Sequence, residues 1–164
     1  MTCARRRSGS PGCSPGEPDE PEAQGLLALL LLLHARSAAR VTAGGSLARL
    51  AEQDRGLWDR DLITEGQAIV RACVQCGHPG PYQIQAAINA VHSFASSFDS
   101  TNWRAILTLY DQLYTLTPTP VVALNRAVTL AEVRGPATPS WRFIGQHGSV
   151  VVRALAARMS VTAR

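Results

Sequence analysis

Residues 103–114 read Trp-Arg-Ala-Ile-Leu-Thr-Leu-Tyr-Asp-Gln-Leu-Tyr, and they indicate the fold class more directly than any other stretch. Large apolar side chains recur there at steps of three and four residues, which places them on one face of an α-helix. We expect Thr101 or Ser100 to cap its N-terminus. The prolines at 118 and 120 end this helix.

A further helix is expected directly after Pro120. Its inward face is predicted to consist of four apolar residues, Val121, Leu124, Val128 and Ala131, and Gly135-Pro136 should end it. Asn125 and Arg126 lie within it, and Asn125 is expected to be buried and to tie neighbouring helix backbones together. These two helices and their proline turn have the size of one helical-repeat unit, about 34 residues.

Three more helices are predicted upstream. The first opens at Pro18-Asp19-Glu20-Pro21-Glu22, where carboxylates favour a helix start, and runs to about Arg36. Because it is apolar almost all round, we expect it to be buried among other helices. The second should run from about Leu57 to Cys76, with Asp54 as its N-cap. The third starts at Pro81 and places Ile84, Ile88, Val91 and Ala95 on one face.

The predicted fold is therefore all-α, built from antiparallel helical hairpins. Gly44-Gly45 between short apolar stretches favours a small β-hairpin or tight loop near residues 40–50. Residues 1–17 are expected to form a disordered head, residues 18–136 the helical domain, and residues 137–164 a poorly ordered tail with a short helix at Val150–Met159.

Charge and hydropathy narrow the classes of function. The formal net charge is +4, but residues 137–164 carry four arginines and no acidic residue, whereas residues 23–136 balance nine arginines against eight acids. A phosphate-binding face on the helical domain is therefore not indicated. The apolar run Leu26–Leu33 is far shorter than the roughly 20 residues of a membrane span. An acidic stretch separates it from Arg5–Arg7, which argues against a signal peptide, so a cytoplasmic protein is expected.

Cys73-Val74-Gln75-Cys76 with nearby His78 is the strongest candidate for metal or redox chemistry. A structural zinc site needs four ligands, and a second close pair is missing. A redox pair favours a helix N-terminus, whereas these cysteines lie near a helix C-terminus. We interpret them as core residues and predict no metal, no cofactor and, since no nucleophile elbow or phosphate loop is present, no enzymatic activity.

Gln53-Asp54-Arg55, followed by Trp58-Asp59, forms a polar patch beside a large aromatic residue. Two interpretations stay open. In the first, Asp54 caps a helix and Trp58 is anchored in the core. In the second, the patch recognises a protein partner, because Trp and Arg dominate such contacts.

Several ordered blocks together resemble the C-terminal extension of bacterial extracytoplasmic-function RNA polymerase sigma factors, in the subgroup whose extension is helical and tetratricopeptide-like. The first block comprises residues 18–22 and 25–29. The second comprises residues 52–55, 58–59, 63 and 65–66, and the third comprises residues 80–88 leading to His92. Trp103 and residues 109–111 and 120–128 complete the set. Within them, the candidate interaction or structural residues are Gln53, Asp54, Arg55, Trp58, Asp59, Gly80, Pro81, Tyr82, Gln85, His92, Asn125 and Arg126.

The resemblance implies a non-catalytic regulatory and protein-interaction domain with tetratricopeptide-like packing. In the full-length family, two further domains bind core RNA polymerase and read promoters. The resemblance covers only residues 18–136, so we expect a truncated or frame-shifted remnant, joined to the family pattern near Pro18 and leaving it near Pro136. Its implied partners are sigma-factor domains, core RNA polymerase or both, with no direct DNA contact and no membrane contact. The alternative is a free-standing helical-repeat adaptor with another protein partner.

Overall fold

The computed structural model describes residues 20–42, 44–75, 77 and 79–135. These residues form five α-helices and contain no strand: α1 (Glu20–His34), α2 (Arg60–Gln75), α3 (Pro81–Phe94), α4 (Trp103–Leu116) and α5 (Pro120–Arg134). The predicted all-α class is confirmed. The predictions for residues 1–17 and 137–164 concern parts of the chain outside the described residues.

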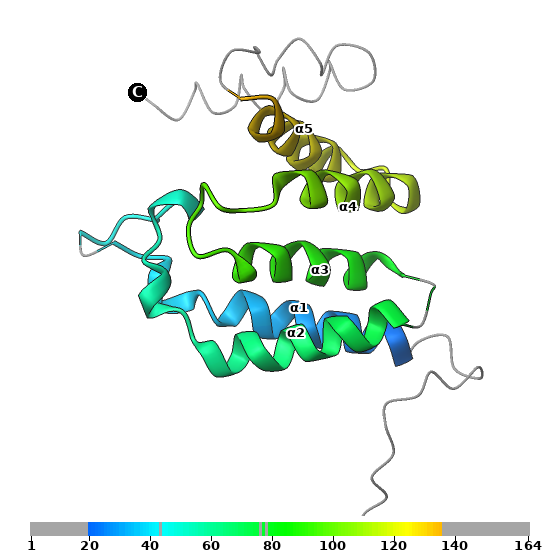
Figure 1. Cartoon of the computed structure of the whole chain (residues 1–164), viewed down its shortest axis with the longest axis horizontal. Helices are drawn as coiled ribbons and strands as arrows, with labels where there is room; N and C mark the ends of the chain where they lie inside the picture. The colour runs from blue at the N-terminus through cyan, green and yellow to red at the C-terminus, as the bar shows by residue number, and fades with distance from the viewer. Residues whose placement is uncertain (1–19, 43, 76, 78, 136–164) are drawn as a thin grey trace, which may run out of the picture.

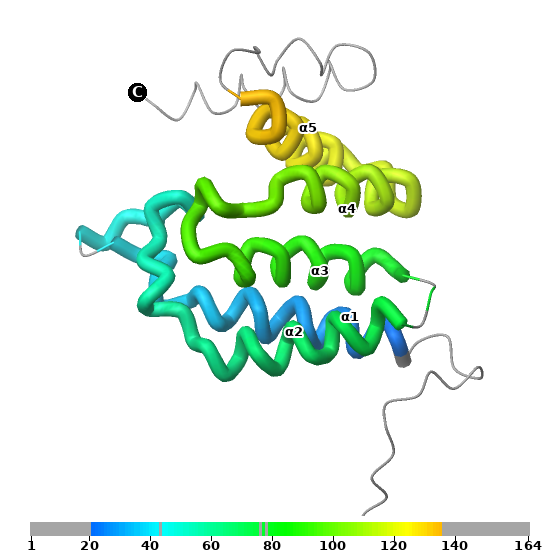
Figure 2. Tube along the Cα trace, viewed as in Figure 1, coloured from blue at the N-terminus to red at the C-terminus, as the bar shows by residue number. Residues whose placement is uncertain are grey.

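The chain reverses direction between successive helices, so that α1 and α3 run the same way and α2 runs against both (Figure 1). α1, α2 and α3 pack against one another, α4 packs on α3, and α5 packs on α4. The tube in Figure 2 shows that the C-terminal ends of α1 and α3 lie at the same end of the molecule, beside the long connection between α1 and α2.

This connection contains three 3₁₀ turns, η1 (Ser37–Ala39), η2 (Leu50–Glu52) and η3 (Arg55–Leu57). The β-hairpin expected near residues 40–50 is reduced to a single antiparallel bridge between Val41 and Leu47. Gly45 adopts a φ of 78°, a conformation that glycine reaches without steric strain.

Close helix packing explains two glycines inside helices. A Cβ on Gly25 of α1 would lie 2.7 Å from the backbone nitrogen of Gln83 in α3, and a Cβ on Gly66 of α2 would lie 2.8 Å from Leu32 Cγ. Both distances are shorter than van der Waals contact allows. The absence of a side chain at Gly25 and at Gly66 therefore permits α1 to approach both α3 and α2.

Three groups of buried apolar side chains hold the helices together, and the smallest of them, Ala28, Leu29 and Ala86, joins α1 to α3. Leu32, Ala35, Trp58, Ile63 and Ala90 join α1, α2 and α3. Ile84, Ile88, Ile106 and Leu113 join α3 to α4, with Val122 of α5 packed against them. Ile84 and Ile88 thus face inward as the apolar period of α3 predicted.

The prediction that α1 is buried on all sides is wrong. Leu26, Leu27 and Leu30 are 37%, 44% and 55% exposed. Only α2 and α3 pack against this helix, so one of its faces has no neighbour within the described residues.

The predicted N-caps are also wrong. Asp54 accepts a hydrogen bond from the Gly56 amide and caps η3, while α2 starts later, where Asp59 accepts from the Asp61 and Leu62 amides. For α4, Asn102 accepts from the Ala105 amide in place of Thr101 or Ser100. Each true cap lies immediately before its helix, one to five residues after the predicted one.

The inward face predicted for α5 is wrong in its phase. Val121 and Val128 are 66% and 53% exposed, whereas Val122 packs against α4 and Thr129 is buried. Asn125 is exposed rather than buried. The apolar residues of α5 therefore lie on two sides: Val121 and Val128 are exposed, whereas Leu124 and Ala131 of the predicted face are half-buried. None of the helices in the described part of the chain combines the length and apolar character needed to cross a bilayer.

We predict that Gly25→Ala lowers the free energy of unfolding by about 1–3 kcal/mol, because the added methyl group overlaps the Gln83 backbone, which cannot rotate away. Helix propensity alone would stabilise the variant by roughly 1 kcal/mol. The sign of the change in the free energy of unfolding therefore shows whether α1 and α3 approach as closely as in the structure. Urea unfolding measures it, with Gln24→Ala on the exposed side of α1 as the control. A more stable Gly25→Ala variant would contradict the close approach of α1 and α3.

Candidate interaction site

Trp58 lies at the end of the molecule where α1 and α3 terminate. Its side chain is only 3% exposed and packs against Leu32, Ala35 and Ala90. The next residue fixes its position, because the Asp59 amide donates to the Ala35 carbonyl at 2.9 Å. Trp58 thereby connects the ends of α1 and α3 to the start of α2.

Two arginines lie against the tryptophan. The guanidinium carbons of Arg55 and Arg36 lie 4.5 Å and 5.8 Å from the centroid of the Trp58 ring, within the range of cation–π attraction. We call these three residues, together with Asn89 and His92, the arginine–tryptophan cluster.

Arg55 caps the C-terminus of α3. Its Nη1 donates to the carbonyl oxygens of His92 and Ala95 at 2.7 and 2.8 Å. The carbonyl groups of the last helical turn carry partial negative charge, so a guanidinium there is favourable. Burial, followed by the charge of Arg60, lowers the pKa of Arg55.

Arg36 follows the end of α1 and is 9% exposed. Its Nη2 donates to Asn89 Oδ1 of α3 at 2.6 Å, while Asn89 Nδ2 donates to the Gln85 carbonyl. Burial, then the charges of Arg40 and Arg55, lowers the pKa of Arg36 to about 10. This value keeps the group charged at neutral pH.

His92 is buried on the same side of α3. Its ring contacts Trp103 edge to face, with the centroids 5.3 Å apart. Burial and the charges of Arg36 and Arg55 lower the pKa of His92 from 6.5 to about 4. The imidazole is therefore neutral at pH 7.

The rest of the predicted polar patch is built from local contacts. Gln53 is half-buried and donates to the Ala48 carbonyl, while Asp54 and Asp59 are exposed and act as caps. The structure thus brings Arg55, Trp58 and His92 together but leaves both aspartates outside the cluster.

At the opposite end of α3, Glu22 of α1 caps the helix. Its carboxylate accepts from the Tyr82 amide at 3.0 Å and the Gln83 amide at 3.4 Å. A Cβ on Gly80 would overlap this carboxylate, and Pro81 occupies the first turn, where no amide is needed. Gln85 donates to the Pro81 carbonyl, and Tyr82 is 44% exposed. The predicted Gly-Pro-Tyr block is therefore a helix start capped from α1.

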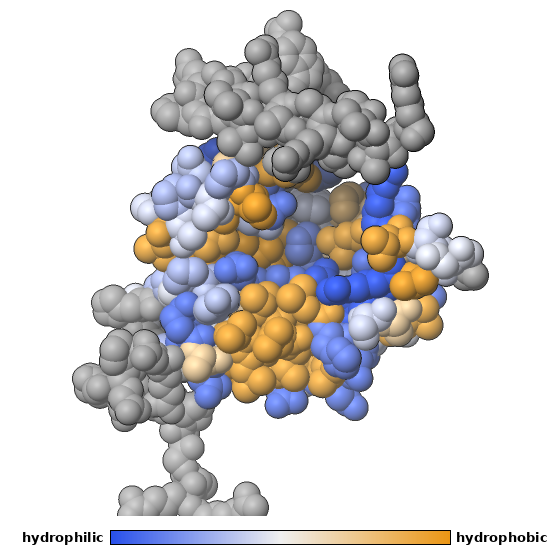
Figure 3. Space-filling model, turned by 180° about the vertical axis from the view of Figure 1, so that it is seen from behind, coloured by the Kyte–Doolittle hydropathy of each residue, from blue (hydrophilic) through white to orange (hydrophobic). Residues whose placement is uncertain are grey.

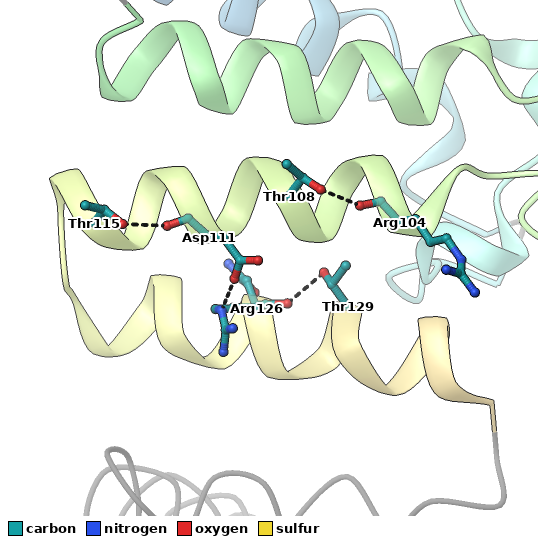
Figure 4. Close-up of polar contacts among 7 residues, drawn as sticks. Arg104, Thr108, Asp111, Thr115, Arg126 and Thr129 are labelled. Atoms are coloured by element: carbon teal, nitrogen blue, oxygen red, sulfur yellow. Dashed lines mark hydrogen bonds and ion pairs between the residues drawn. The ribbon is translucent and has the colours of Figure 1, made fainter.

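The Asn125-Arg126 motif joins α4 to α5. Arg126 Nε donates to Asp111 Oδ1 in an ion pair across the two helices, and the Asn125 carbonyl accepts from the Thr129 hydroxyl (Figure 4). Both charged side chains are about half exposed, so the pair contributes roughly 0.2–1 kcal/mol. This ion pair links α4 to α5. The expected bridge from a buried Asn125 to neighbouring helix backbones is absent, because Asn125 is exposed.

Cys73 is buried, and its Sγ lies 4.0 Å from the Pro21 carbonyl. Burial, then the nearby Glu22 charge, raises the pKa of its thiol, which disfavours the reactive thiolate. Its proposed partners Cys76 and His78 lie outside the described residues. Within the described part of the chain, no group of three or more His, Cys, Asp or Glu side chains could hold a metal ion.

Three residues of these contacts were absent from the predicted site: Arg36, Asn89 and Glu22. Arg36 and Asn89 are 53 residues apart in the chain, and Glu22 and Tyr82 are 60 apart. No local spacing could have paired them. For Arg36 and Glu22, the available signal was the sign of their charge relative to the helix ends, whereas the neutral Asn89 offered none.

Comparison with known proteins places the chain beside proteins without an assigned activity. Residues 13–74 match a family of unknown function (DUF6596). An uncharacterised protein of Rhizobium meliloti (strain 1021) is 50% identical over 119 residues, which make up 73% of this chain. The chain spans only 28% of the length of this relative. No solved structure matches the chain.

We predict that acid destabilises the protein partly through His92. The unfolded chain binds a proton near pH 6.5 and the folded chain near pH 4, so the free energy of unfolding falls as the pH drops through this window, by about 2–3 kcal/mol in total. Urea unfolding at pH 7 and pH 4 measures the loss. His92→Gln should lack this part of the pH dependence, and His34→Gln, at an exposed position, should keep it. An equal loss in His92→Gln would show that His92 does not contribute.

Proposed function

We propose that the chain is a non-catalytic regulatory and protein-interaction domain of an RNA polymerase sigma factor of the extracytoplasmic-function type, acting in the cytoplasm. Its partners are sigma-factor domains, core RNA polymerase or both. The ordered sequence blocks that resemble the helical extension of these factors support the family, and the surface of the helices supports the role.

The observation that carries the proposal is the apolar surface of α1. Seen from behind, a group of apolar side chains gathers over this helix and is bordered by polar residues (Figure 3). Leu26, Leu27 and Leu30 contribute exposed fractions of 37% to 55%. An apolar patch with a polar rim is typical of a protein–protein contact.

The outer face of α5 offers a second apolar surface. Val121 and Val128 are both more than half exposed, and Leu116 at the end of α4 is 53% exposed. Because α5 packs only on α4 within the described residues, this face is available for a neighbour. Helical repeats bury such faces against the next repeat.

The length of the relative agrees with this role. The aligned 119 residues make up only 28% of the Rhizobium meliloti protein, so in that protein the shared helices are part of a longer chain. Residues 23–136 are nearly balanced in charge, which favours protein partners over direct contact with DNA.

Several charged side chains of the described residues have structural roles. Asp54, Asp59 and Glu22 cap helices, Arg55 caps the end of α3, and Arg126 pairs with Asp111. A role in binding therefore explains the arrangement better than acid–base catalysis.

The test is a pull-down with the full chain as bait and two purified proteins, core RNA polymerase and a two-domain sigma fragment, as prey. We expect retention of at least one. Leu30→Glu should weaken binding about tenfold or more, because a carboxylate would be desolvated in an apolar contact. Gln24→Glu adds the same charge to an exposed position of α1 and should bind like the original chain.

Two outcomes would contradict the proposal. If neither prey is retained, the proposed sigma-factor role is wrong. Specific capture of an unrelated protein would favour a free-standing helical-repeat adaptor. Equal binding by Leu30→Glu would show that the surface of α1 is not the contact.

A further inference from the structure

The arginine–tryptophan cluster contains more hydrogen-bond donors than acceptors. Arg36 Nε, Arg55 Nη2, Trp58 Nε1 and His92 Nδ1 are buried, and none has a hydrogen-bond partner. The first three are N–H donors, whereas the neutral imidazole of His92 offers at most one acceptor. Buried N–H groups are nearly always paired in folded proteins, so three unpaired donors around one aromatic ring indicate a missing acceptor.

The cluster is also short of negative charge. The ion pairs of the described residues, Arg49 with Glu52 and Arg126 with Asp111, include neither Arg36 nor Arg55. Two helix C-termini each supply about half a negative charge, which offsets only about one of the two guanidinium charges. A buried cation normally has an anionic partner.

The edge of the Arg36 guanidinium shows where an anion would fit. Its Nη2 already donates to Asn89 Oδ1 at 2.6 Å, whereas the adjacent Nε on the same edge donates to nothing. A carboxylate can accept two parallel hydrogen bonds from this edge, while a single amide oxygen satisfies only one donor.

We propose that the arginine–tryptophan cluster is a binding site for a carboxylate, which accepts hydrogen bonds from Arg36 Nε, Arg55 Nη2 and Trp58 Nε1. In the context of the proposed function, on which this assignment rests for its biological source, the carboxylate belongs to an aspartate or glutamate of a protein partner. A free small-molecule carboxylate has the same chemistry.

Entry of the carboxylate requires movement of the segment that contains η2, because Leu50 of η2 packs against the core around Trp58, whereas η3 carries Arg55 of the site itself. The three unpaired donors are inaccessible to solvent in this structure, and Arg55 itself is only half-buried. A short 3₁₀ turn holds this segment, and such a turn contributes few backbone hydrogen bonds. Displacing it is therefore easier than displacing α1 or α3.

NMR spectroscopy of the ¹⁵N-labelled full chain tests the proposal at pH 7. The signals of Trp58 Nε1–H and Arg36 Nε–H are followed while sodium acetate is added, with sodium chloride at equal ionic strength as the reference. Two further titrations use a glutamate-containing peptide and the same peptide with glutamine. We expect acetate and the glutamate peptide to shift both signals in a saturable manner, and chloride and the glutamine peptide to leave them in place.

Variants locate the response. Asn89→Asp places a carboxylate beside Arg36 and should weaken acetate binding at least tenfold, because the site already has its anion. Arg36→Gln should also lose binding. Arg104→Gln removes an exposed arginine of α4 and should leave the response unchanged. If Arg36→Gln does not fold, the acetate titration of Asn89→Asp still tests the site.

The source of the carboxylate follows from the affinities. Tenfold tighter binding of the glutamate peptide than of acetate supports a protein source, and equal binding supports a small-molecule carboxylate. No saturable shift with either probe, or an unchanged response in Asn89→Asp, would overturn the site and leave ordered water as the acceptor. These results are independent of the pull-down, which tests the surface of α1.

Discussion

The contacts of Trp58 with Arg36 and Arg55 are those on which the rest of the fold depends. Two helices that run in the same direction, α1 and α3, end beside this tryptophan and bring the partial negative charges of their C-termini together. Arg55 meets this charge at the end of α3, where its Nη1 donates to the His92 and Ala95 carbonyl oxygens, and the Trp58 ring packs against Ala35 and Ala90 near the helix ends. Without these residues, the ends of α1 and α3 would expose both unpaired carbonyl groups and apolar core.

At the N-terminus of α3, a negatively charged side chain caps the helix. Glu22 of α1 accepts hydrogen bonds from the first amides of α3, where the helix carries partial positive charge. Gly25, one turn later, allows the two helices to approach until no side chain fits between them. The pairing of α1 with α3 is therefore fixed at both ends by charge and in between by the absence of a side chain.

The sequence predicted the number of helices in the described region, their order and most of their ends, because apolar period, proline and glycine are local signals. It also named Arg55, Trp58 and His92 among the candidate interaction or structural residues, and the structure brings these three together. It failed for Arg36 and Asn89, whose contact spans 53 residues, and for the orientation of α5, where valines on both faces made the period ambiguous. The exposed leucines of α1 could not be foreseen, because the sequence does not state how many neighbours a helix has.

A three-helix core is closed by Trp58, and the α4–α5 hairpin adds a face that has no neighbour within the described residues. Hydrogen exchange of individual backbone amides in the free chain tests this arrangement most directly. We predict that amides of α1 and α3, and the Asp59 amide bonded to Ala35, exchange only through global unfolding. Amides of α5 should exchange much faster, through local opening. Equal protection of α5 and α3 would contradict this arrangement, since it would show that the outer face of α5 is already covered.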